Sequence, residues 1–498
     1  MKNFGKKDLV KNRGLNGIFF IVLFSFILLV LLLNSCEKVE FENRYDTPPK
    51  LEDIDPPKQD TTMTPEEINI YVNQWIMSNM EKHYLWNDKM PMDISLAASP
   101  ITFYKTLLYN YGNVNGDRFS QIVQLNAAKS YIATPRAGYD YVLLGSPGSL
   151  SIYAFVNYVD KNSPAASAGL KRGDIILKIN GVQLTRSNFV HLTGQIASNH
   201  TITMGEVNAA NSLVPTKDIA LSVAYYNDSP IFLDTVIDVN GKKIAYLVYN
   251  SFMPDANKPL RFDMELNAIF GEFKKQGATE LVLDLRFNGG GTLTNATNLA
   301  SMILSPEHNG KVFAKRDYND VMKAEYLDKN GEEFFYNRFV SNINGTLINS
   351  LGVNKLYVLI SHRTASASEL IINGLSPYID VVTIGRERTV GKNVGSIRIT
   401  SNDKLINWEL QPIVVRLSNS IGFSDYTGGF APKYYANEYD IKNPRQLGDT
   451  SEPLLAKAIS LITGQSTFTS VESIDNNVET ISASQLILQP EKQRLYID

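Results

Sequence analysis

The chain has 498 residues, of which 44% are hydrophobic and 20% are charged, and its formal net charge at pH 7 is −3. A chain of this length can form two or three domains with a large core. The near balance of 48 basic and 51 acidic residues gives no strong field, which argues against nucleic acid as a partner.

The N-terminal residues indicate an export signal and a lipid anchor. Basic residues at 2–13 precede an apolar run, Ile18 to Leu33, which is short for a membrane span of about 20 residues but typical of a signal peptide. Leu33-Asn34-Ser35-Cys36 resembles a bacterial lipobox, and Cys36 is the only cysteine. We therefore expect residues 1–36 to be a lipoprotein signal peptide. Acyl chains on Cys36 would hold the protein at a membrane of the cell envelope, outside the cytoplasm.

Two segments follow the predicted anchor. Residues 37–63 are rich in charge and proline, which predicts a flexible tether. Thr64-Pro65-Glu66-Glu67 then combines a capping hydroxyl, a proline in the first turn and acidic residues at the positive end of a helix dipole. Apolar residues at helical spacing come next. We expect a small helical domain over residues 64–130, with Asp117-Arg118-Phe119-Ser120 near its end.

Short predicted strands replace the helices over residues 138–226. A strand at 153–159 leads into Ser163-Pro164-Ala165-Ala166-Ser167-Ala168-Gly169-Leu170, and a strand at 175–179 is followed by the turn Asn180-Gly181. This order resembles a PDZ domain, which binds a peptide as an added strand and holds its terminal carboxylate on backbone N–H groups. An unrelated small β domain is the alternative. Asp140 lies near the expected carboxylate site, which argues against a domain that binds free C-termini.

Residues 227–464 alternate between strands and helices, as an α/β domain does. We expect strands over 243–249, 281–285, 356–360 and 381–384, and helices over 262–276, 293–304 and 451–461. Residues 465–498 are polar and weakly patterned, which predicts a tail that is partly disordered.

The most informative stretch is Thr364-Ala365-Ser366-Ala367-Ser368-Glu369, between two predicted strands. A turn of small residues exposes a serine hydroxyl, which is a nucleophile if a base activates it. The simpler interpretation is a capping box, because Ser366 and Glu369 have its spacing. The two interpretations are compatible, since a nucleophile can also begin a helix.

Two further motifs supply the other parts of a catalytic site. Lys392, in an apolar and glycine-flanked stretch, is a candidate base if burial populates its neutral form, and a surface lysine is the alternative. Asn288-Gly289-Gly290-Gly291 follows a buried strand and could direct backbone N–H groups toward an oxyanion or a phosphate. His362, four residues before Ser366, is a weaker candidate base. No metal-binding spacing is present, so we expect neither a metal nor a cofactor.

Together these motifs resemble the C-terminal processing peptidases, the serine peptidases of family S41. The resemblance implies a crotonase-like or ClpP-like α/β core with an inserted PDZ-like domain and a small N-terminal helical domain. It implies Ser366 as nucleophile, Lys392 as general base, and the backbone N–H groups of Gly290 and Ala367 as the oxyanion hole. Many members have a glutamine four residues after the lysine; here that position is Ser396, which becomes the candidate for orienting the lysine.

We therefore expect a serine endopeptidase that cleaves exported or tail-presented polypeptides through a Ser–Lys dyad and an acyl-enzyme intermediate. One alternative is a non-catalytic peptide-binding lipoprotein that retains the fold. A second is a structural or nutrient-uptake lipoprotein in which the motif match is accidental.

Overall fold

A computed structural model of the chain describes residues 63–125, 135–226, 229–465, 478–481 and 495–496. The predicted signal peptide, Cys36 and all but the last residue of the predicted tether lie outside the described residues. Within the described part of the chain, no helix is both long and apolar enough to cross a membrane.

The N-terminal region contains two helices and a strand that pairs with a distant part of the chain. Helix α2 (Pro65–His83) begins as predicted, because Thr64 and Glu67 form a capping box. The 3-10 helix η1 (Asn87–Lys89) and helix α3 (Pro100–Leu107) follow. Strand β1 (Gln121–Gln124) pairs antiparallel with β20 (Trp408–Gln411), which pairs with β19 (Ile399–Thr400). Side chains of β19 and β20 complete the core beneath α2 and α3.

The segment predicted to resemble a PDZ domain is an antiparallel sheet with short helices. Its strands have the order β23-β2-β3-β4-β6-β7, and β5 pairs with β4. The Asn180-Gly181 turn between β4 and β5 forms as predicted, with positive φ at both residues. The elements are β2 (Tyr139–Gly145), β3 (Ile152–Val159), α4 (Pro164–Ser167), β4 (Ile175–Ile179), β5 (Val182–Gln183), α5 (Phe189–Gly194), η2 (Gln195–Ala197), β6 (His200–Val207), β7 (Leu213–Leu221) and β23 (Glu479–Thr480).

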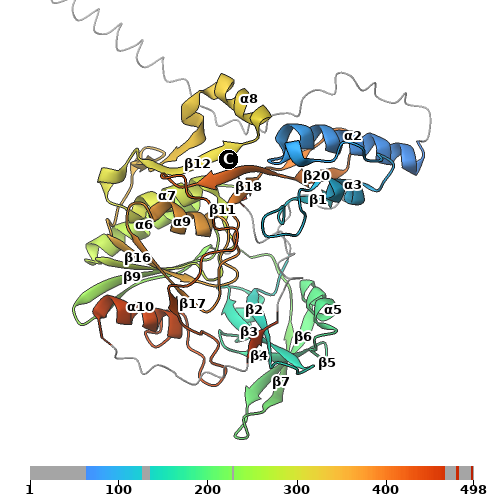
Figure 1. The fold of residues 1–498 in the computed structure, drawn as a ribbon. Helices are drawn as coiled ribbons and strands as arrows, with labels where there is room; N and C mark the ends of the chain where they lie inside the picture. The colour runs from blue at the N-terminus through green and yellow to red at the C-terminus, as the bar shows by residue number, and fades with distance from the viewer. Residues whose placement is uncertain (1–62, 126–134, 227–228, 466–477, 482–494, 497–498) are drawn as a thin grey trace, which may run out of the picture. The chain divides into compact units, whose positions relative to one another are not determined.

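The central sheet of the α/β core has the order β22-β17-β16-β10-β9-β8, with every pair parallel except β8 and β9. Helices α6, α7 and α9 cover one face and α10 covers the other (Figure 1). The elements are β8 (Ile231–Val239), β9 (Lys242–Tyr249), α6 (Arg261–Lys275), β10 (Glu280–Asp284), α7 (Leu293–Ile303), β16 (Lys355–Ile360), α9 (Ala367–Leu375), β17 (Asp380–Gly385), β22 (Tyr434–Tyr435) and α10 (Pro453–Thr463).

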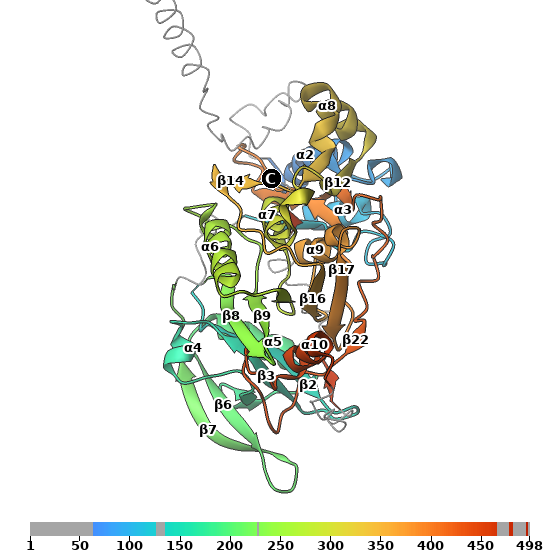
Figure 2. The ribbon, with the colours of Figure 1, turned by 90° about the vertical axis from the view of Figure 1, so that its left-hand side faces the viewer.

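A second sheet of the core has the order β11-β24-β18-β21-β12-β13. Figure 2 shows the helices α7 and α9 between this sheet and the central one. The remaining elements are β11 (Gly291–Thr292), η3 (Pro306–His308), β12 (Val312–Tyr318), α8 (Asp320–Asn330), η4 (Glu332–Phe335), β13 (Tyr336–Arg338), β14 (Asn342–Ile343), β15 (Thr346–Leu347), β18 (Val394–Ser396), β21 (Ile413–Ser418) and β24 (Leu495–Tyr496). The predicted α/β class is confirmed, and the strands and helices predicted for the core form within about two residues of their expected ends.

Candidate active site

Ser366 lies at the turn between β16 and α9, where the sequence predicts it. Its φ of 63° and ψ of −115° place it in a region that residues other than glycine rarely adopt. Such a conformation costs about 1–3 kcal/mol, so the surrounding structure must hold it. The residue is 1% exposed, and its hydroxyl has no hydrogen-bond partner among the described residues. Because buried polar atoms are nearly always paired, Ser366 Oγ is a strong candidate for contact with a ligand.

The capping interpretation accounts for Glu369 but not for the serine hydroxyl. The Glu369 carboxylate accepts a hydrogen bond from Ser366 N–H at 2.9 Å. The Ser366 side chain is arranged as in a capping box, yet it makes no cap hydrogen bond. The helix start thus orients the serine backbone and leaves its side chain uncommitted.

The serine turn is attached to the loop that follows β10. Thr364 Oγ1 donates to Leu285 O at 2.9 Å. The carbonyl of Asn288 accepts two hydrogen bonds, from Ala365 N–H at 3.1 Å and from Ser368 Oγ at 3.0 Å. These contacts bring the glycine-rich loop and the Ser366 turn together, as the two parts of an oxyanion site require.

Gly291 of this loop is required by a close backbone contact. Gly291 has a φ of 154°, and a Cβ at this position would lie 2.2 Å from the carbonyl carbon of Phe252. Gly290 N–H donates to Asn288 Oδ1 at 2.9 Å. An oxyanion bound by Gly290 would therefore replace this bond. Ala367 is the first residue of α9, so its N–H has no partner within the helix.

Glu369 connects Ser366 to Lys392. The same oxygen, Oε2, accepts from Ser366 N–H at 2.9 Å and from Lys392 N–H at 2.8 Å, so the two backbone nitrogens lie less than about 6 Å apart. The other oxygen accepts from Gly391 N–H at 2.6 Å and from the Thr389 hydroxyl. Burial raises the pKa of Glu369, although these hydrogen bonds act in the opposite direction.

Lys392 is buried, with 3% exposure, and does not have the position of a surface lysine. Its Nζ lies 5.2 Å from the centre of the Phe119 ring. The neighbouring Arg118 donates to Gly391 O at 3.2 Å and to Thr427 O at 2.8 Å. The N-terminal region thus contributes directly to the surroundings of the candidate base.

The sequence did not predict that Arg118 and Phe119 lie beside Lys392. Asp117-Arg118-Phe119-Ser120 was visible as a polar and aromatic motif at the end of the helical region, but nothing in its spacing relates it to Lys392. In the structure, Asp117 Oδ1 accepts from Phe119 N–H and Ser120 N–H, which fixes the loop. Ser120 Oγ then accepts from Ile413 N–H at 2.8 Å, which attaches the loop to the core.

Ser396, the candidate for orienting the lysine, lies in β18 and is 5% exposed. The backbone of β24 pairs in parallel with β18 at Ser396 and with β11 at Gly291 and Thr292. A segment of the chain therefore lies between the strand that carries Ser396 and the strand that follows the glycine loop. The orienting role of Ser396 stays a prediction.

The alternative base and the acidic residue of the PDZ-like region have other partners. His362 Nδ1 faces Glu387 Oε2 and not Ser366. Asp140 is paired with Arg363, whose Nη2 donates to Asp140 Oδ2 at 2.7 Å. The residue next to the expected carboxylate site thus connects the PDZ-like region to the turn that carries Ser366.

A buried charge network supports the loop before the glycines. Arg286 is 0% exposed and lies 2.8 Å from Asp284, 2.8 Å from Glu438 and 2.6 Å from Glu452. Glu438 also pairs at 2.9 Å with Arg172 of the PDZ-like region. Burial raises the pKa of Asp284. Burial acts in the same direction on Glu438, but the two arginines hold the pKa of this carboxyl below its usual range.

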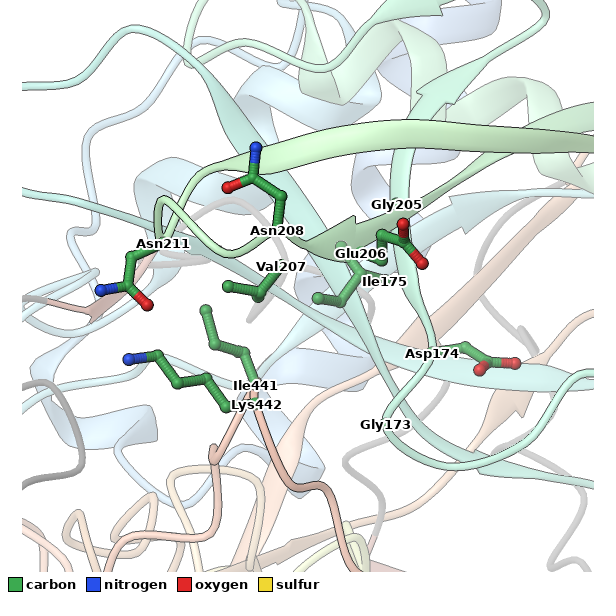
Figure 3. A pocket seen from close by; sticks show the side chains of 10 residues that line it. All are labelled: Gly173, Asp174, Ile175, Gly205, Glu206, Val207, Asn208, Asn211, Ile441 and Lys442. Carbon is green, nitrogen blue, oxygen red and sulfur yellow. The ribbon is translucent and has the colours of Figure 1, made fainter.

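Neither a metal cluster nor the pocket in Figure 3 accounts for the site. The described residues contain no group of three or more His, Cys, Asp or Glu side chains that could hold a metal ion. The pocket in Figure 3 has a volume of about 370 Å³ and lies between the β4–β6 region and Ile441-Lys442. None of its lining residues belongs to the Ser366 site, so the pocket takes no part in the chemistry of the serine.

Comparison with known families identifies this arrangement. The model of Peptidase family S41 matches residues 243–414, that of the Peptidase S41 N-terminal domain matches residues 71–121, and that of the PDZ domain matches residues 155–191. The chain carries a peptidase family S41 domain. This S41 domain includes the glycine loop, Ser366, Glu369 and Lys392. The predicted resemblance to a PDZ domain is also confirmed.

Curated relatives and a solved structure support the same family. A carboxyl-terminal-processing protease of Picosynechococcus sp. is 26% identical over 239 residues, which are 47% of this chain and 49% of that protein. The carboxy-terminal processing protease CtpA of Bacillus subtilis is 27% identical over 283 residues, 55% of this chain and 52% of that protein. The chain thus spans about half the length of the curated relatives it matches. A crystal structure named as an S41 protease, from Bacteroides fragilis, has 29% sequence identity and a TM-score of 0.64, and the match covers 78% of this chain and 97% of that one.

Proposed function

We propose that the protein is a serine peptidase that cleaves exported or tail-presented polypeptides through a dyad of Ser366 and Lys392. The observation that carries the proposal is the shared Glu369 oxygen, which holds both backbones beside a buried serine hydroxyl that has no partner among the described residues. The S41 and PDZ domains support a polypeptide as the substrate.

The reaction follows acyl-enzyme chemistry. Ser366 Oγ attacks the carbonyl carbon of the scissile bond while its proton passes to Lys392 Nζ. The negative charge that forms on the carbonyl oxygen is bound by the N–H groups of Gly290 and Ala367. The C–N bond then breaks as Lys392 returns the proton to the leaving amine. Water, deprotonated by Lys392, hydrolyses the ester and restores Ser366.

The burial of Lys392 is what suits it to this role. A general base must have a populated neutral form, and removal from water disfavours an ammonium ion. Its ring contact with Phe119 works against this effect, because an aromatic face attracts a cation. Substrate binding and Ser396 would then determine the ratio of neutral to charged Lys392.

Substitution of the dyad tests the proposal. Ser366→Ala and Lys392→Ala should each lower casein cleavage by at least about a thousandfold, since the dyad acts as one unit. Ser341→Ala and Lys323→Ala are matched controls at exposed positions of the same domain and should retain the wild-type rate. Full cleavage by a folded Ser366→Ala variant would refute the assignment.

A non-catalytic peptide-binding protein is the second candidate, and one observation favours it. The Gly290 N–H is committed to Asn288 Oδ1, so one of the two proposed oxyanion donors is occupied. A serine-directed fluorophosphonate probe separates the candidates. Labelling at Ser366, located by peptide mass spectrometry, supports the peptidase. Peptide binding without labelling supports the second candidate.

We also propose that lipidated Cys36 holds the protein at a membrane of the cell envelope. The proposal is supported by the basic and apolar residues that precede the lipobox. Metabolic labelling with an alkyne fatty acid should mark the wild-type protein and not Cys36→Ala. Release of Cys36→Ala into the soluble fraction should accompany the loss of label, whereas equal labelling of both would refute the proposal.

A further inference from the structure

The edge of the PDZ sheet is already covered by another part of the same chain. Strand β23 pairs antiparallel with β2, with Thr480 opposite Leu144 and Glu479 opposite Gly145. Ile481 N–H continues the ladder by donating to Leu143 O at 2.9 Å. Because β2 is the edge strand on this side of β3, residues 478–481 take the place of a peptide added to the sheet.

Apolar side chains of this segment enter the domain on both faces of the sheet. Ile481 is 7% exposed and packs in the cluster that contains Leu143, Phe189 of α5 and Leu192 of α5. Val478 is also 7% exposed and belongs to the cluster on the opposite face. A side chain placed between an edge strand and a helix is the usual way in which an added strand gains specificity.

Polar contacts attach three of these residues, Val478, Glu479 and Thr480, to the two neighbouring domains. Glu479 forms an ion pair with Arg186 of the PDZ domain. On the side of the S41 domain, Arg386 Nη2 donates to Val478 O at 2.6 Å, and Thr480 Oγ1 donates to Glu387 Oε1 at 2.9 Å. Polar contacts as well as apolar packing therefore hold the segment in place.

The ligand held here is an internal segment, not a free chain end. The chain continues past Ile481 to at least Asp498. Asp140 of β2 is buried and is paired with Arg363 and with Asn157. The Arg363 guanidinium at this end of β2 is thus already paired with a carboxylate of the domain itself.

We infer that residues 478–481 are an intramolecular ligand of the PDZ domain, which a separate polypeptide must displace to bind the β2 edge. A covalently attached ligand has an effective concentration of about 1 mM. Binding of a free peptide to the intact protein is weakened by the ratio of this effective concentration to the Kd at the released edge, so a Kd of about 100 μM or below gives at least about a tenfold difference.

The inference concerns binding and does not depend on peptide cleavage. Its test uses the full chain with Ser366→Ala, so that neither peptidase activity nor its absence affects the measurement. The probe is a fluorescein-labelled peptide with the sequence of residues 475–484, and its binding is followed by fluorescence anisotropy. Ile481→Asp is the releasing variant, because a charged carboxylate is expelled from an apolar cluster yet costs nothing in a segment exposed to water.

Ile481→Asp should lower the Kd of the peptide at least about tenfold, whereas Ile481→Val, which keeps a branched apolar side chain, should behave as the parent protein. Glu479→Arg faces Arg186 with a like charge and should give a smaller shift in the same direction. Circular dichroism melting shows whether each variant is folded. Equal Kd values for the parent, Ile481→Asp and Glu479→Arg would overturn the inference, and so would a folded Ile481→Asp that does not bind the peptide.

Discussion

Replacing Glu369 with glutamine tests whether this carboxylate positions the candidate dyad. Thr389 and Gly391 donate to Oε1, and Ser366 and Lys392 donate to Oε2. The new amide nitrogen cannot accept hydrogen bonds. It fits best on the Oε1 side, where the Thr389 hydroxyl can rotate and accept, so that only the Gly391 N–H loses its acceptor. One unpaired buried donor costs about 1–3 kcal/mol.

Alanine at the same position should have a much larger effect, because all four donors then lose their acceptor. We expect Glu369→Gln to lower the free energy of unfolding by about 1–3 kcal/mol and Glu369→Ala by about 4 kcal/mol or more. Urea unfolding followed by tryptophan fluorescence measures both. Glu332→Gln, at an exposed glutamate of the same domain, is the matched control and should change the value by less than about 0.5 kcal/mol.

Casein cleavage should fall as well as stability. A displacement of about 1 Å in the loop of Gly391 and Lys392 is enough to lower the rate about a hundredfold. A folded Glu369→Ala variant that cleaves casein within twofold of the wild type would show that Glu369 does not position the dyad. The same result would remove the main geometric support for Lys392 as the base.

The raised pKa of Glu369 adds a dependence on pH whose sign can be worked out. The native state holds the proton more tightly than the unfolded state, so this residue's contribution to stability is greatest below the unfolded pKa near 4.5 and falls as the pH rises through the folded value. The stability difference between wild type and Glu369→Gln should therefore shrink as the pH rises above about 4.5. A difference that grows with pH would contradict the direction of this shift.

Three further outcomes are expected. Arg118→Ala should lower the kcat/KM of casein cleavage about tenfold, because its hydrogen bonds hold the lysine loop; the exposed Lys105→Ala is the control. Arg286→Ala should lower the free energy of unfolding by about 3–5 kcal/mol by leaving buried carboxylates unpaired, whereas Arg338→Ala, at an exposed ion pair, should cost less than about 1 kcal/mol. The depressed pKa of Glu438 contributes stability above about pH 4.5 that is lost on acidification, so Glu438→Gln should flatten the fall in unfolding free energy between pH 6 and pH 3.

Local sequence signals were sufficient to predict the strands of the central sheet and the turn that carries Ser366. The runs around 281–285 and 356–360 are apolar and continuous because both faces of these parallel strands are covered by helices. The turn between β16 and α9 was predictable because small residues separate a strand from a helix. Its positive φ at Ser366 was not, since residues other than glycine rarely adopt this conformation and nothing local in the sequence signals it.

The residues that sequence reasoning missed act across long separations. Glu369 was identified as a helix cap from its spacing to Ser366, but its bonds to the loop of Lys392 depend on a crossing that spacing does not encode. Phe119 and Arg118 reach the same loop from the other end of the chain. The tail was expected to be polar, weakly patterned and partly disordered, and its sequence did not indicate β23 and β24, whose partners are strands of the folded domains.

The pairing of β1 with β20 has a consequence for the order of folding. Ser120 and Ile413, joined by a hydrogen bond, are separated by 293 residues. The loop that carries Phe119 therefore cannot reach its final position until the chain has been synthesised past Ile413, the first residue of β21. Contacts between residues so far apart in the sequence form late in folding, because closing a large loop costs conformational entropy before the contacts can stabilise it. A partly emerged chain thus lacks the surroundings of Lys392, so the lysine environment is assembled only at the end of folding, when nearly the whole S41 domain is available.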